Sequence, residues 1–599
     1  MHLSTLDWSI IIGFFVVFAI IGIAVSRRSG KNTTEFFLSG RNMPWWLLGI
    51  SMVATTFSAD TPNLVADIVR QNGISGNWVW WAFLLTGMVT VFIYAKLWRR
   101  SEVLTDLEFY ELRYSGKEAA FLRGFRALYL GAFFNIMIMA SVCLAAIKIG
   151  SILFGLQPWQ SVVYASVITV IYSAFGGLRG VIFTDFLQFG VAMAGSIAGA
   201  YYLISLPEVG GLSALLSHEL VVDKLDFLPD FNDSSTFIPI LLIPLAVQWW
   251  SVWYPGAEPG GGGYIAQRML SAKDEKNAIG ATLLFNIAHY ALRPWPWILI
   301  SLASLVLYPE LASIQSEFPN VSSDIIGHDL AYPAMLTKLP SGLLGLVAAS
   351  LIAAFMSTIS THLNWGSSYI ALDFYKRFIK PEASETQLVT IGRLSTVLLM
   401  VVSAVLALTL ESALSTFNIL LQIGAGTGLI FILRWFWWRI NAYSEITGMI
   451  VSLLLAIWFQ YGHEAAFGER WASHIELVVS VGITTVSWIV VTLLTRPTSL
   501  DRLHTFYTKV QPYGKGWNGF RQKAAQLNIS ETVNGVQDSF TKDLLSVVLG
   551  IVLVYCALFA TGYVLYASYG NALLLSGIVL LCTYGILRIQ TKSKFTRLK

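Results

Sequence analysis

The sequence predicts an all-α protein that crosses a membrane many times, and its composition and segment lengths support this prediction. Of the 599 residues, 55% are hydrophobic and only 12% are charged, which is about half the charged share of an ordinary soluble domain. So few charges could not cover the surface of a soluble protein, and an aromatic content of 14% excludes a disordered chain. A spanning helix needs about twenty apolar residues, and about fifteen segments meet that requirement.

These predicted spans follow one another along the whole chain. They cover residues 8–26, 44–71, 76–98, 124–150, 158–176, 180–205, 236–265, 279–308, 341–374, 388–411, 413–436, 445–462, 474–495, 544–568 and 571–589. The first is not expected to be a cleaved signal peptide, because its basic cluster follows the apolar run instead of preceding it.

The distribution of Lys and Arg predicts the orientation in the membrane, because cytoplasmic loops collect positive charge. Arg27, Arg28 and Lys31 follow the first span, so the N-terminus is expected outside. The basic C-terminal tail, residues 592–599, is then expected in the cytoplasm, and an odd number of spans fits. The net charge of +4 is explained by these loops and needs no nucleic-acid partner. We therefore expect a multi-pass protein of the cell membrane, with a bacterial inner membrane favoured.

Two of the predicted spans are interrupted. The second contains the run from Thr55 to Asn63, which combines hydroxyls, a carboxylate and Pro62 in mid-segment. The seventh contains residues 254–263, with two prolines and a run of four glycines. Proline removes a backbone donor and clashes with the preceding turn. Unwound backbone at bilayer depth is tolerated only where it is buried in protein or lines a polar cavity.

The spacing of the interruptions indicates an inverted repeat. They lie five spans apart, and because five is odd, two five-helix units must enter the membrane from opposite sides. Paired interruptions of this kind point to the binding site of a secondary transporter. The alternative is that both are ordinary proline kinks. The four glycines do not form a nucleotide loop, because no Gly-Lys-Ser/Thr follows them.

The ninth predicted span carries a row of side-chain oxygens that could bind a cation. The spacing of these residues places them on one face of a helix: Ser357, Ser360, Thr361, Asn364 and Ser368. A dehydrated monovalent cation needs several oxygen ligands, by the logic that holds for hard divalent ions, and an unwound helix adds free carbonyls. The alternative is that small hydroxyl residues only let helices pack closely.

Asp185 lies about five residues into the sixth predicted span, roughly 7–8 Å from its cytoplasmic end at 1.5 Å per residue. A carboxylate at that depth is costly, and the default hypothesis is that it is functional. Ser360 and Thr361 are expected in the same half of the bilayer. The alternatives for Asp185 are a simple pair with Arg179 or a helix cap.

Several motifs together resemble the sodium:solute symporter family, which includes sodium–galactose, sodium–proline and sodium–sialic acid transporters. Residues 176–188 match its GG-x-x-GV-x-x-TD-x-x-Q signature, with Asp185 and Gln188 at the last two fixed positions. The other similar stretches are residues 36–46, Gln267-Arg268 after the seventh-span break, residues 357–375, and residues 438–441. The resemblance covers about residues 8–460.

The resemblance implies a ten-helix inverted-repeat core of the leucine-transporter type that works by alternating access. On this basis the expected units are 1–43 (an extra helix and leader), 44–205 (core helices 1–5), 206–440 (core helices 6–10), 441–495 (two further helices), 496–543 (a cytoplasmic linker resting on the membrane surface) and 544–599 (two C-terminal helices and the tail).

The resemblance also implies two sodium sites and sodium as the coupling ion, with no organic cofactor. The positions that match the family's first site are the carbonyls of Ala54, Phe57 and Ala354 and the hydroxyls of Ser357 and Thr358. The positions that match a second site, present in some members, are Asp185, Ser357, Ser360 and Thr361. All of these oxygens are present, so two sodium ions per cycle are expected.

Substrate positions are predicted more loosely. Asn135 matches a sugar-contacting asparagine of the galactose transporter, and Tyr254 matches its inner-gate tyrosine. The remaining candidates are Thr56, Ser58, Asp60 and Thr61 at the first break, His289 and Arg293 in the eighth span, and Gln422. A buried arginine can bind a carboxylate or sugar hydroxyls, or can pair with Asp60 or Glu258. Five tryptophans offer flat faces for a sugar, namely Trp249, Trp250, Trp253, Trp295 and Trp297.

The expected function is that of a sodium-coupled symporter, and not an enzyme, that imports a small polar solute, with a sugar or sugar derivative favoured. A carboxylate or amino-acid substrate is the alternative. A membrane sensor with a transporter-like domain would need a signalling module, and residues 496–543 are too short for one. A membrane-embedded transferase should show a metal-binding acidic cluster or a large extramembrane domain, and the sequence has neither. The expected partners are the solute, Na+ and the lipid bilayer.

Overall fold

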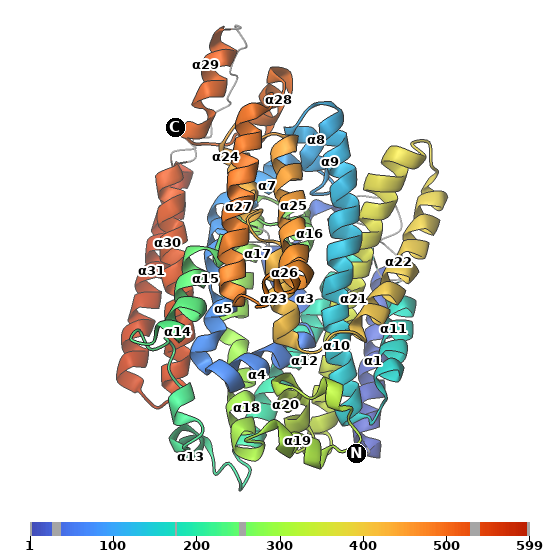
Figure 1. The fold of residues 1–599 in the computed structure, drawn as a ribbon, viewed down its shortest axis with the longest axis vertical. Helices are drawn as coiled ribbons and strands as arrows, with labels where there is room; N and C mark the ends of the chain where they lie inside the picture. The colour runs from blue at the N-terminus through green and yellow to red at the C-terminus, as the bar shows by residue number, and fades with distance from the viewer. Residues whose placement is uncertain (1–2, 27–37, 174–176, 251–258, 527–538, 596–599) are drawn as a thin grey trace.

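The computed structural model describes residues 3–26, 38–173, 177–250, 259–526 and 539–595. These residues form helices joined by turns and loops, with one isolated β-bridge between Met43 and Ala272. The long helices run roughly along one axis, with the N-terminus at one end of the molecule and α28 and α29 at the other (Figure 1). The predicted all-α class is confirmed.

The helices follow one another with few long loops, and short 3₁₀ or π turns between them are marked η. The N-terminal third contains α1 (Thr5–Ser26), α3 (Trp45–Thr56), α4 (Asp60–Asn72), η2 (Ile74–Asn77), α5 (Trp78–Trp81), α6 (Leu84–Val89), η3 (Thr90–Tyr94), α7 (Ala95–Ser101), α8 (Glu108–Arg113), α9 (Gly116–Leu128), η4 (Tyr129–Phe134), α10 (Asn135–Leu153), α11 (Pro158–Ser173) and α12 (Gly177–Ile204).

The middle of the chain contains α13 (Leu212–Ser217), α14 (Ser234–Phe237), η6 (Ile238–Leu242), α15 (Ile243–Ala246), η7 (Gln248–Trp250), α16 (Gly263–Ser271), α17 (Glu275–Ile287), η8 (Ala288–Leu292), α18 (Pro294–Leu307), α19 (Leu311–Glu317), η10 (His328–Leu330), α20 (Ala331–Leu336), α21 (Leu343–Ser368), η11 (Tyr369–Ile379), α22 (Glu385–Ala407), α23 (Ala413–Ile423) and α24 (Gly428–Phe436). The C-terminal part contains α25 (Ala442–Ile457), α26 (His463–Phe467), α27 (Ser473–Leu494), α28 (Leu500–Val510), η13 (Lys515–Trp517), α29 (Asn518–Gln526), α30 (Phe540–Leu565) and α31 (Tyr569–Phe595).

Within the described ranges, ten helices are long and apolar enough to cross a membrane. A pair bent by 45°, Phe417–Ile423 with Gly428–Phe436, gives an eleventh. Shorter apolar helices cover Thr5–Val17, Trp45–Thr56 and Ser234–Trp250. The second and seventh predicted spans divide into shorter pieces, and α11 has only 16 residues, so none of these three enters the count.

The predicted break in the second span is confirmed, but it precedes the proline. Helix α3 ends at Thr56, and Phe57 leaves the helical region with φ −83° and ψ 78°. Helix α4 then begins at Asp60, so Pro62 lies in its first turn. The missing N–H of a proline costs little at that position. The break therefore occupies residues 57–59.

The break in the seventh span is described only in part. The first piece ends at Trp250 in η7, and the helix resumes at Gly263 as α16. Gly260 and Gly261 have φ values of +89° and +78°, which glycine adopts without steric cost. Residues 251–258, including Tyr254 and Glu258, lie outside the described residues.

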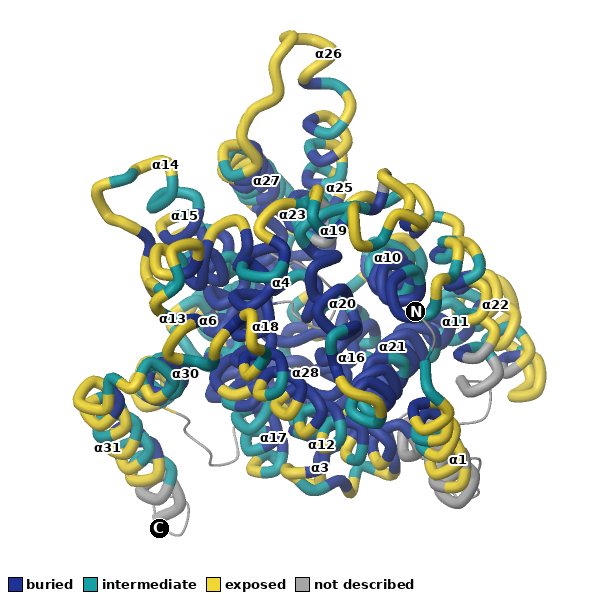
Figure 2. The backbone as a smooth tube through the Cα atoms, turned by 90° about the horizontal axis from the view of Figure 1, so that it is seen from below, coloured by how far each residue is buried: buried dark blue, intermediate teal, exposed yellow. Residues whose placement is uncertain are grey.

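The centre of the molecule is built around α21, which packs against α1, α10, α11, α12 and α22. On the other side of the core, α4 packs against α18 and α20, and α17 packs against α3 and α7. Buried residues concentrate in this central group, whereas α1, α22 and α31 lie at the edge with exposed residues on their outer faces (Figure 2). Exposed apolar helices are expected of a protein whose surroundings are lipid.

The described part of the linker packs on the core, and its position relative to the membrane surface stays a prediction. The buried Trp517 donates from Nε1 to the carbonyl of Trp435 at 2.8 Å. The guanidinium of Arg113 lies 5.2 Å from the Trp517 ring and 5.4 Å from the Phe506 ring. The linker helices therefore dock on the ends of α8 and α24. Further along, α30 packs on α6 and η8, and α31 packs on α30.

Glu111 on α8 forms an ion cluster near the expected cytoplasmic side. It lies 2.6 Å from Arg123 and 2.8 Å from Arg377. Burial alone would raise the pKa of Glu111, but hydrogen bonds from Arg377 and Arg123 outweigh it, and the pKa lies below its ordinary value. A depressed folded-state pKa contributes stability above the unfolded value of about 4.3, and this stability is lost as the pH falls through the folded value.

We therefore expect Glu111→Gln to lower thermal stability at neutral pH by less than about 1 kcal/mol, because the cluster is partly exposed. At a pH below the folded pKa of Glu111, the stabilities of variant and parent should converge. Thermal unfolding in detergent across the acid range measures this difference. A stability gap that stays constant with pH would show that the carboxylate charge is not its source.

Candidate functional site

The broken end of α3 faces α21, and a side chain of α21 reaches its last turn. Thr358 donates from Oγ1 to the carbonyl of Thr55 at 3.2 Å, with both residues buried. The backbone N–H of Phe57 donates hydrogen bonds to the carbonyls of Val53 and Ala54, at 2.8 and 3.1 Å. The last turn of α3 therefore contacts a hydroxyl of α21. The sequence predicts this arrangement, with the carbonyls of a broken helix opposite a row of hydroxyl side chains.

The five residues predicted for the first cation site lie on this pair of helices and are buried. Ala54 and Phe57 lie on either side of the end of α3, and Ala354 precedes Thr358 by one turn of α21. The hydroxyl of Ser357 does not point freely into this space, because it donates to Asp185 Oδ1 at 2.7 Å. Ser357 thus links the first predicted cluster to the second.

The second predicted cluster is centred on Asp185, which is fully buried on α12. Its other oxygen, Oδ2, accepts from Ser51 at 2.7 Å and lies 3.9 Å from the guanidinium of Arg268. Arg268 also donates to Thr55 Oγ1 at 3.2 Å. A positive side chain therefore lies beside the carboxylate at the place predicted for a cation. The Arg179 side chain, the alternative partner that the sequence suggests, lies outside the described residues.

The remaining oxygens of that cluster come from the next turn of α21. Ser360 donates to the carbonyl of Ser357 at 3.0 Å. Thr361 Oγ1 is buried and has no hydrogen-bond partner among the residues that the structure describes. A buried hydroxyl without a partner is uncommon, and a bound ion or water is one explanation for it. Sequence reasoning missed Ser51 and Arg268, although Ser51 precedes Thr55 by one helical turn.

A cavity lies directly beside the break. Six of the predicted substrate residues line it, namely Thr56, Ser58, Asp60, Thr61, His289 and Arg293. Thr358 belongs to the same lining, so the cavity shares this residue with the first cation cluster. Thr55, whose carbonyl accepts from Thr358, also lines the cavity. The remaining lining is Leu64, Val65, Trp80, Ile138, Ser141, Val142, Tyr290, His362, Phe417 and Leu420.

The polar groups of the cavity wall include atoms that a solute could engage. Asp60 accepts from Ser141 through Oδ2 at 3.4 Å. Its Oδ1 and the hydroxyl oxygen of Ser58 are also buried in the wall. Such atoms normally bond protein, water or ligand. The wall therefore offers at least one acceptor and one hydroxyl for a polar solute.

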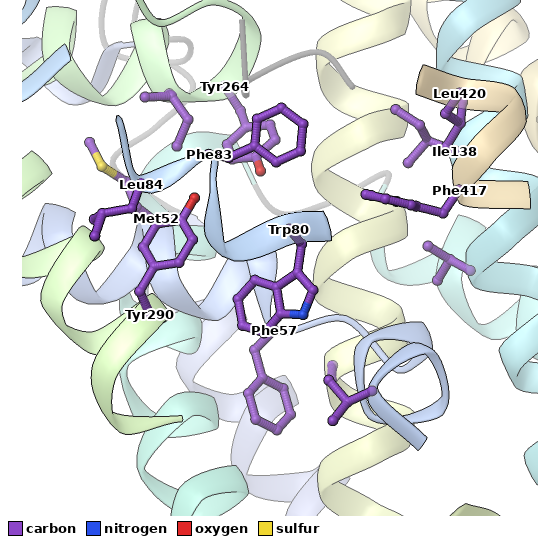
Figure 3. Close-up of a cluster of buried hydrophobic side chains, with 14 of the residues drawn as sticks. Met52, Phe57, Trp80, Phe83, Leu84, Ile138, Tyr264, Tyr290, Phe417 and Leu420 are labelled. Atoms are coloured by element: carbon purple, nitrogen blue, oxygen red, sulfur yellow. The ribbon is translucent and has the colours of Figure 1, made fainter. Parts of the chain in front are cut away.

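The aromatic part of the wall differs from the predicted tryptophan cluster. Trp80 lines the cavity and stacks on Tyr290, with ring centroids 5.8 Å apart and planes at 21°. Trp297 instead packs on Phe57 at 5.0 Å, and Trp295 packs away from the cavity. Figure 3 shows Trp80 near the centre of the view, with Phe57 below it and Phe417 to its right.

Two predicted substrate residues do not line the cavity. Asn135 is buried behind it, donating to the carbonyl of His362 at 2.8 Å and pairing through Oδ1 with His362 Nδ1 at 2.6 Å. Asn135 therefore reaches the cavity only through His362. Gln422 lies on the other face of α23, where it donates to Glu476 and lines a separate cavity between α4, η6 and α27.

The comparison with protein-family models decides the family. The model of the sodium:solute symporter family matches residues 36–452. The chain belongs to this family. The match includes both breaks, the Asp185 cluster and the cavity, and it ends before α27, the linker and the last two helices.

Relatives of this family member include sodium-coupled transporters of animals and bacteria. It is 26% identical over 482 residues to sodium/glucose cotransporter 1 of Oryctolagus cuniculus, covering 75% of this chain and 71% of the relative. It is 24% identical to the sodium/glucose cotransporter of Vibrio parahaemolyticus, covering 77% and 86%. It is 25% identical to the sodium/sialic acid symporter SiaT of Proteus mirabilis, covering 77% and 91%.

A solved structure of a Na+-coupled sialic acid symporter, in a substrate-bound outward-open state, confirms the fold. The likeness has a TM-score of 0.64 at 21% identity and covers 83% of this chain and all of that one. The core of the family member is therefore of the leucine-transporter type, as the sequence resemblance implied.

Proposed function

We propose that this chain is a sodium-coupled symporter that imports a small polar solute, with a sugar or sugar derivative favoured, and carries two sodium ions per cycle. The observation that supports this best is that Thr358 belongs both to the first cation cluster and to the cavity lining, beside Thr55, whose carbonyl it contacts. Because this pair borders both, an ion bound there changes the wall that the solute contacts.

In the proposed cycle, the first sodium ion binds between the carbonyls of Ala54, Phe57 and Ala354 and the hydroxyls of Ser357 and Thr358. The second sodium ion binds Asp185, Ser357, Ser360 and Thr361. There its positive charge takes the place of the Arg268 guanidinium as the counter-charge of the Asp185 carboxylate. The ions tie the broken end of α3 to α21 and complete the cavity for the solute. One charge moving inward through 100 mV releases about 2.3 kcal/mol, so two ions supply a strong driving force.

The wall chemistry favours a polyhydroxylated ring. Trp80 and Tyr290 present aromatic surface, while Asp60, Ser58 and Thr61 present hydrogen-bonding groups. The names of the relatives, glucose and sialic acid transporters, agree with this class. A carboxylate or amino-acid substrate is the second candidate, because Arg293 also lines the cavity and guanidinium groups bind carboxylates well.

The proposed orientation follows the positive charge of the loops. The N-terminus lies outside and the C-terminal tail lies in the cytoplasm, so α13, α19 and η10 are on the outer side. A single cysteine in the 309–340 loop should react with an impermeant maleimide in intact cells, and one in the C-terminal tail should not.

Uptake into proteoliposomes tests the function. With an inward sodium gradient, a panel of radiolabelled hexoses, sialic acid and amino acids should include at least one solute that accumulates saturably. Replacing external sodium with choline should abolish that accumulation. Equal uptake in choline or potassium buffer for every accumulated solute would rule out sodium coupling.

The second sodium site is tested by Asp185→Asn, which removes the charged ligand and leaves a side chain of similar size. We expect the Hill coefficient for sodium to fall from near two to near one. Thr361→Val removes only a hydroxyl that has no partner among the described residues, and it should act in the same direction without disturbing Arg268. An unchanged Hill coefficient in both variants would remove the second site.

A further inference from the structure

Thr56, the last residue of α3, is the centre of a closed hydrogen-bond network with the eighth span. Its Oγ1 lies 2.9 Å from the carbonyl of Val53 and 3.1 Å from that of Met52. The same oxygen lies 3.1 Å from Arg293 Nη1 and 3.1 Å from His289 Nδ1. A hydroxyl has one proton, and the two backbone carbonyls can only accept. We assign this proton to the backbone, because the Val53 carbonyl is the nearest of the four neighbours and a carbonyl acts only as an acceptor.

This assignment makes Nδ1 of His289 a hydrogen-bond donor. Since the hydroxyl proton of Thr56 points at its own helix, the oxygen accepts from Arg293 and from the Nδ1–H of His289. His289 Nε2 is then the acceptor of the neutral ring, and it lies 3.4 Å from Arg293 Nη2. The three side chains form a ring of donors and acceptors in which each link has a defined direction.

Aromatic rings pack against the side chains of Arg293 and His289 and hold them in place. The Arg293 guanidinium lies 5.4 Å from the Trp297 ring, and Trp297 packs in turn on Phe57. The centroid of the His289 ring lies 4.5 Å from that of Tyr290 and 5.8 Å from that of Trp80. His289 and Arg293 are 5% and 2% exposed. Both side chains are thus fixed against the last turn of α3 as well as bordering the cavity.

Thr56 lies where the hydrogen-bond network can set the positions of the backbone carbonyls at the end of α3. Thr56 lies between Ala54 and Phe57, whose carbonyls are proposed sodium ligands, and it occupies the last helical position before the break. A helix end has no intrahelical partners for its last carbonyls, so its geometry depends on outside contacts. Because the chain is continuous, a shift of Thr56 moves both carbonyls at once.

We propose that His289 and Arg293 are positioning residues that hold the last turn of α3 through Thr56 and so set the geometry of the first sodium site. This inference rests on the proposed sodium-coupled function. It changes the role predicted for both residues from solute ligands to supports of the ion site. Loss of groups that orient metal ligands typically weakens metal binding about 10–100-fold, and that is the expected range.

The test measures sodium affinity without any solute, from the rise of the melting temperature of the purified protein with sodium concentration. His289→Ala removes the donor to Thr56 and should weaken the apparent sodium affinity about 10–100-fold. His289→Asn returns an N–H close to the position of Nδ1 and should restore most of the affinity. Ser141→Ala, on the opposite wall beside Asp60, is the matched control and should leave sodium affinity unchanged while raising the KM for solute.

Thr56→Val supplies a second route if His289→Ala does not fold. It keeps the shape of the side chain and removes the shared acceptor, so the same loss of sodium affinity is expected. Parental sodium affinity in these variants, with only the solute KM raised, would overturn the inference and return both residues to the solute site. If the parent protein itself shows no sodium-dependent stabilisation, the proposed function fails instead.

Discussion

Thr358→Val is expected to weaken sodium binding by at least about tenfold, by analogy with losses measured at metal sites, and to abolish sodium-driven accumulation at ordinary sodium concentrations. The Thr358 hydroxyl is the group that joins α21 to the broken end of α3, at 3.2 Å from the Thr55 carbonyl. Valine fills the same volume, so packing is kept while an ion ligand is lost. Initial uptake rates at increasing sodium concentration measure the effect.

Ser367→Ala is the matched control on the same helix. Ser367 is also buried, and its hydroxyl donates to the carbonyl of Asn364 at 3.1 Å, more than two turns beyond the site. It should leave the sodium dependence unchanged. Sodium dependence that is identical in Thr358→Val and the parent would exclude Thr358 as a ligand.

Lys148→Met is expected to destabilise the protein by about 3–5 kcal/mol, because it leaves a buried carboxylate without its counter-charge. Lys148 on α10 lies 2.5 and 2.6 Å from the two oxygens of Asp329 in η10, and it also donates to the carbonyl of Glu411. The two side chains are 0% and 1% exposed. Denaturant or thermal unfolding in detergent measures the loss.

Two further variants identify the cause of that loss. Lys148→Met with Asp329→Leu removes both charges and should recover much of the stability, because a buried pair often contributes little net energy. Lys338→Met breaks a partly exposed pair with Glu317 and should cost less than about 1 kcal/mol. A Lys148→Met protein as stable as Lys338→Met would show that the buried pair does not hold the loop that contains η10 on α10.

The general architecture can be predicted from the sequence because it depends on local patterns. Runs of apolar residues give the spans, and the hydroxyl spacing on α21 gives the oxygen-lined face. Pro62 predicts a break in the second span, but the structure places the non-helical residues before the proline. The proline itself lies in the first turn of α4, where a missing N–H removes no hydrogen bond within the helix.

The composition of the site can be predicted only in part, because its walls come from distant helices. Trp80, Ser141 and Phe417 lie on α5, α10 and α23, and no local motif connects them. Arg268 belongs to the Gln267-Arg268 motif, but its approach to Asp185 depends on how α16 packs against α3 and α21. Gln422 shows the converse, since α23 turns it toward Glu476 and away from the cavity.

Docking of the linker could not be predicted from the sequence either. Its aromatic residues are compatible with a membrane surface, and only the folded chain shows that Trp517 lies against the end of α24 and the Arg113 guanidinium. Contacts of this kind depend on shape complementarity between segments that are far apart in the chain.

Equilibrium binding of radioactive sodium to the purified protein, without solute, tests the central claim most directly. If an ion binds between α3 and α21, we expect saturable binding that choline does not compete for, that weakens by at least about tenfold in Thr358→Val, and that persists in Ser367→Ala. Absence of saturable binding, or binding that is the same in Thr358→Val and the parent, would contradict the placement of the ion between α3 and α21.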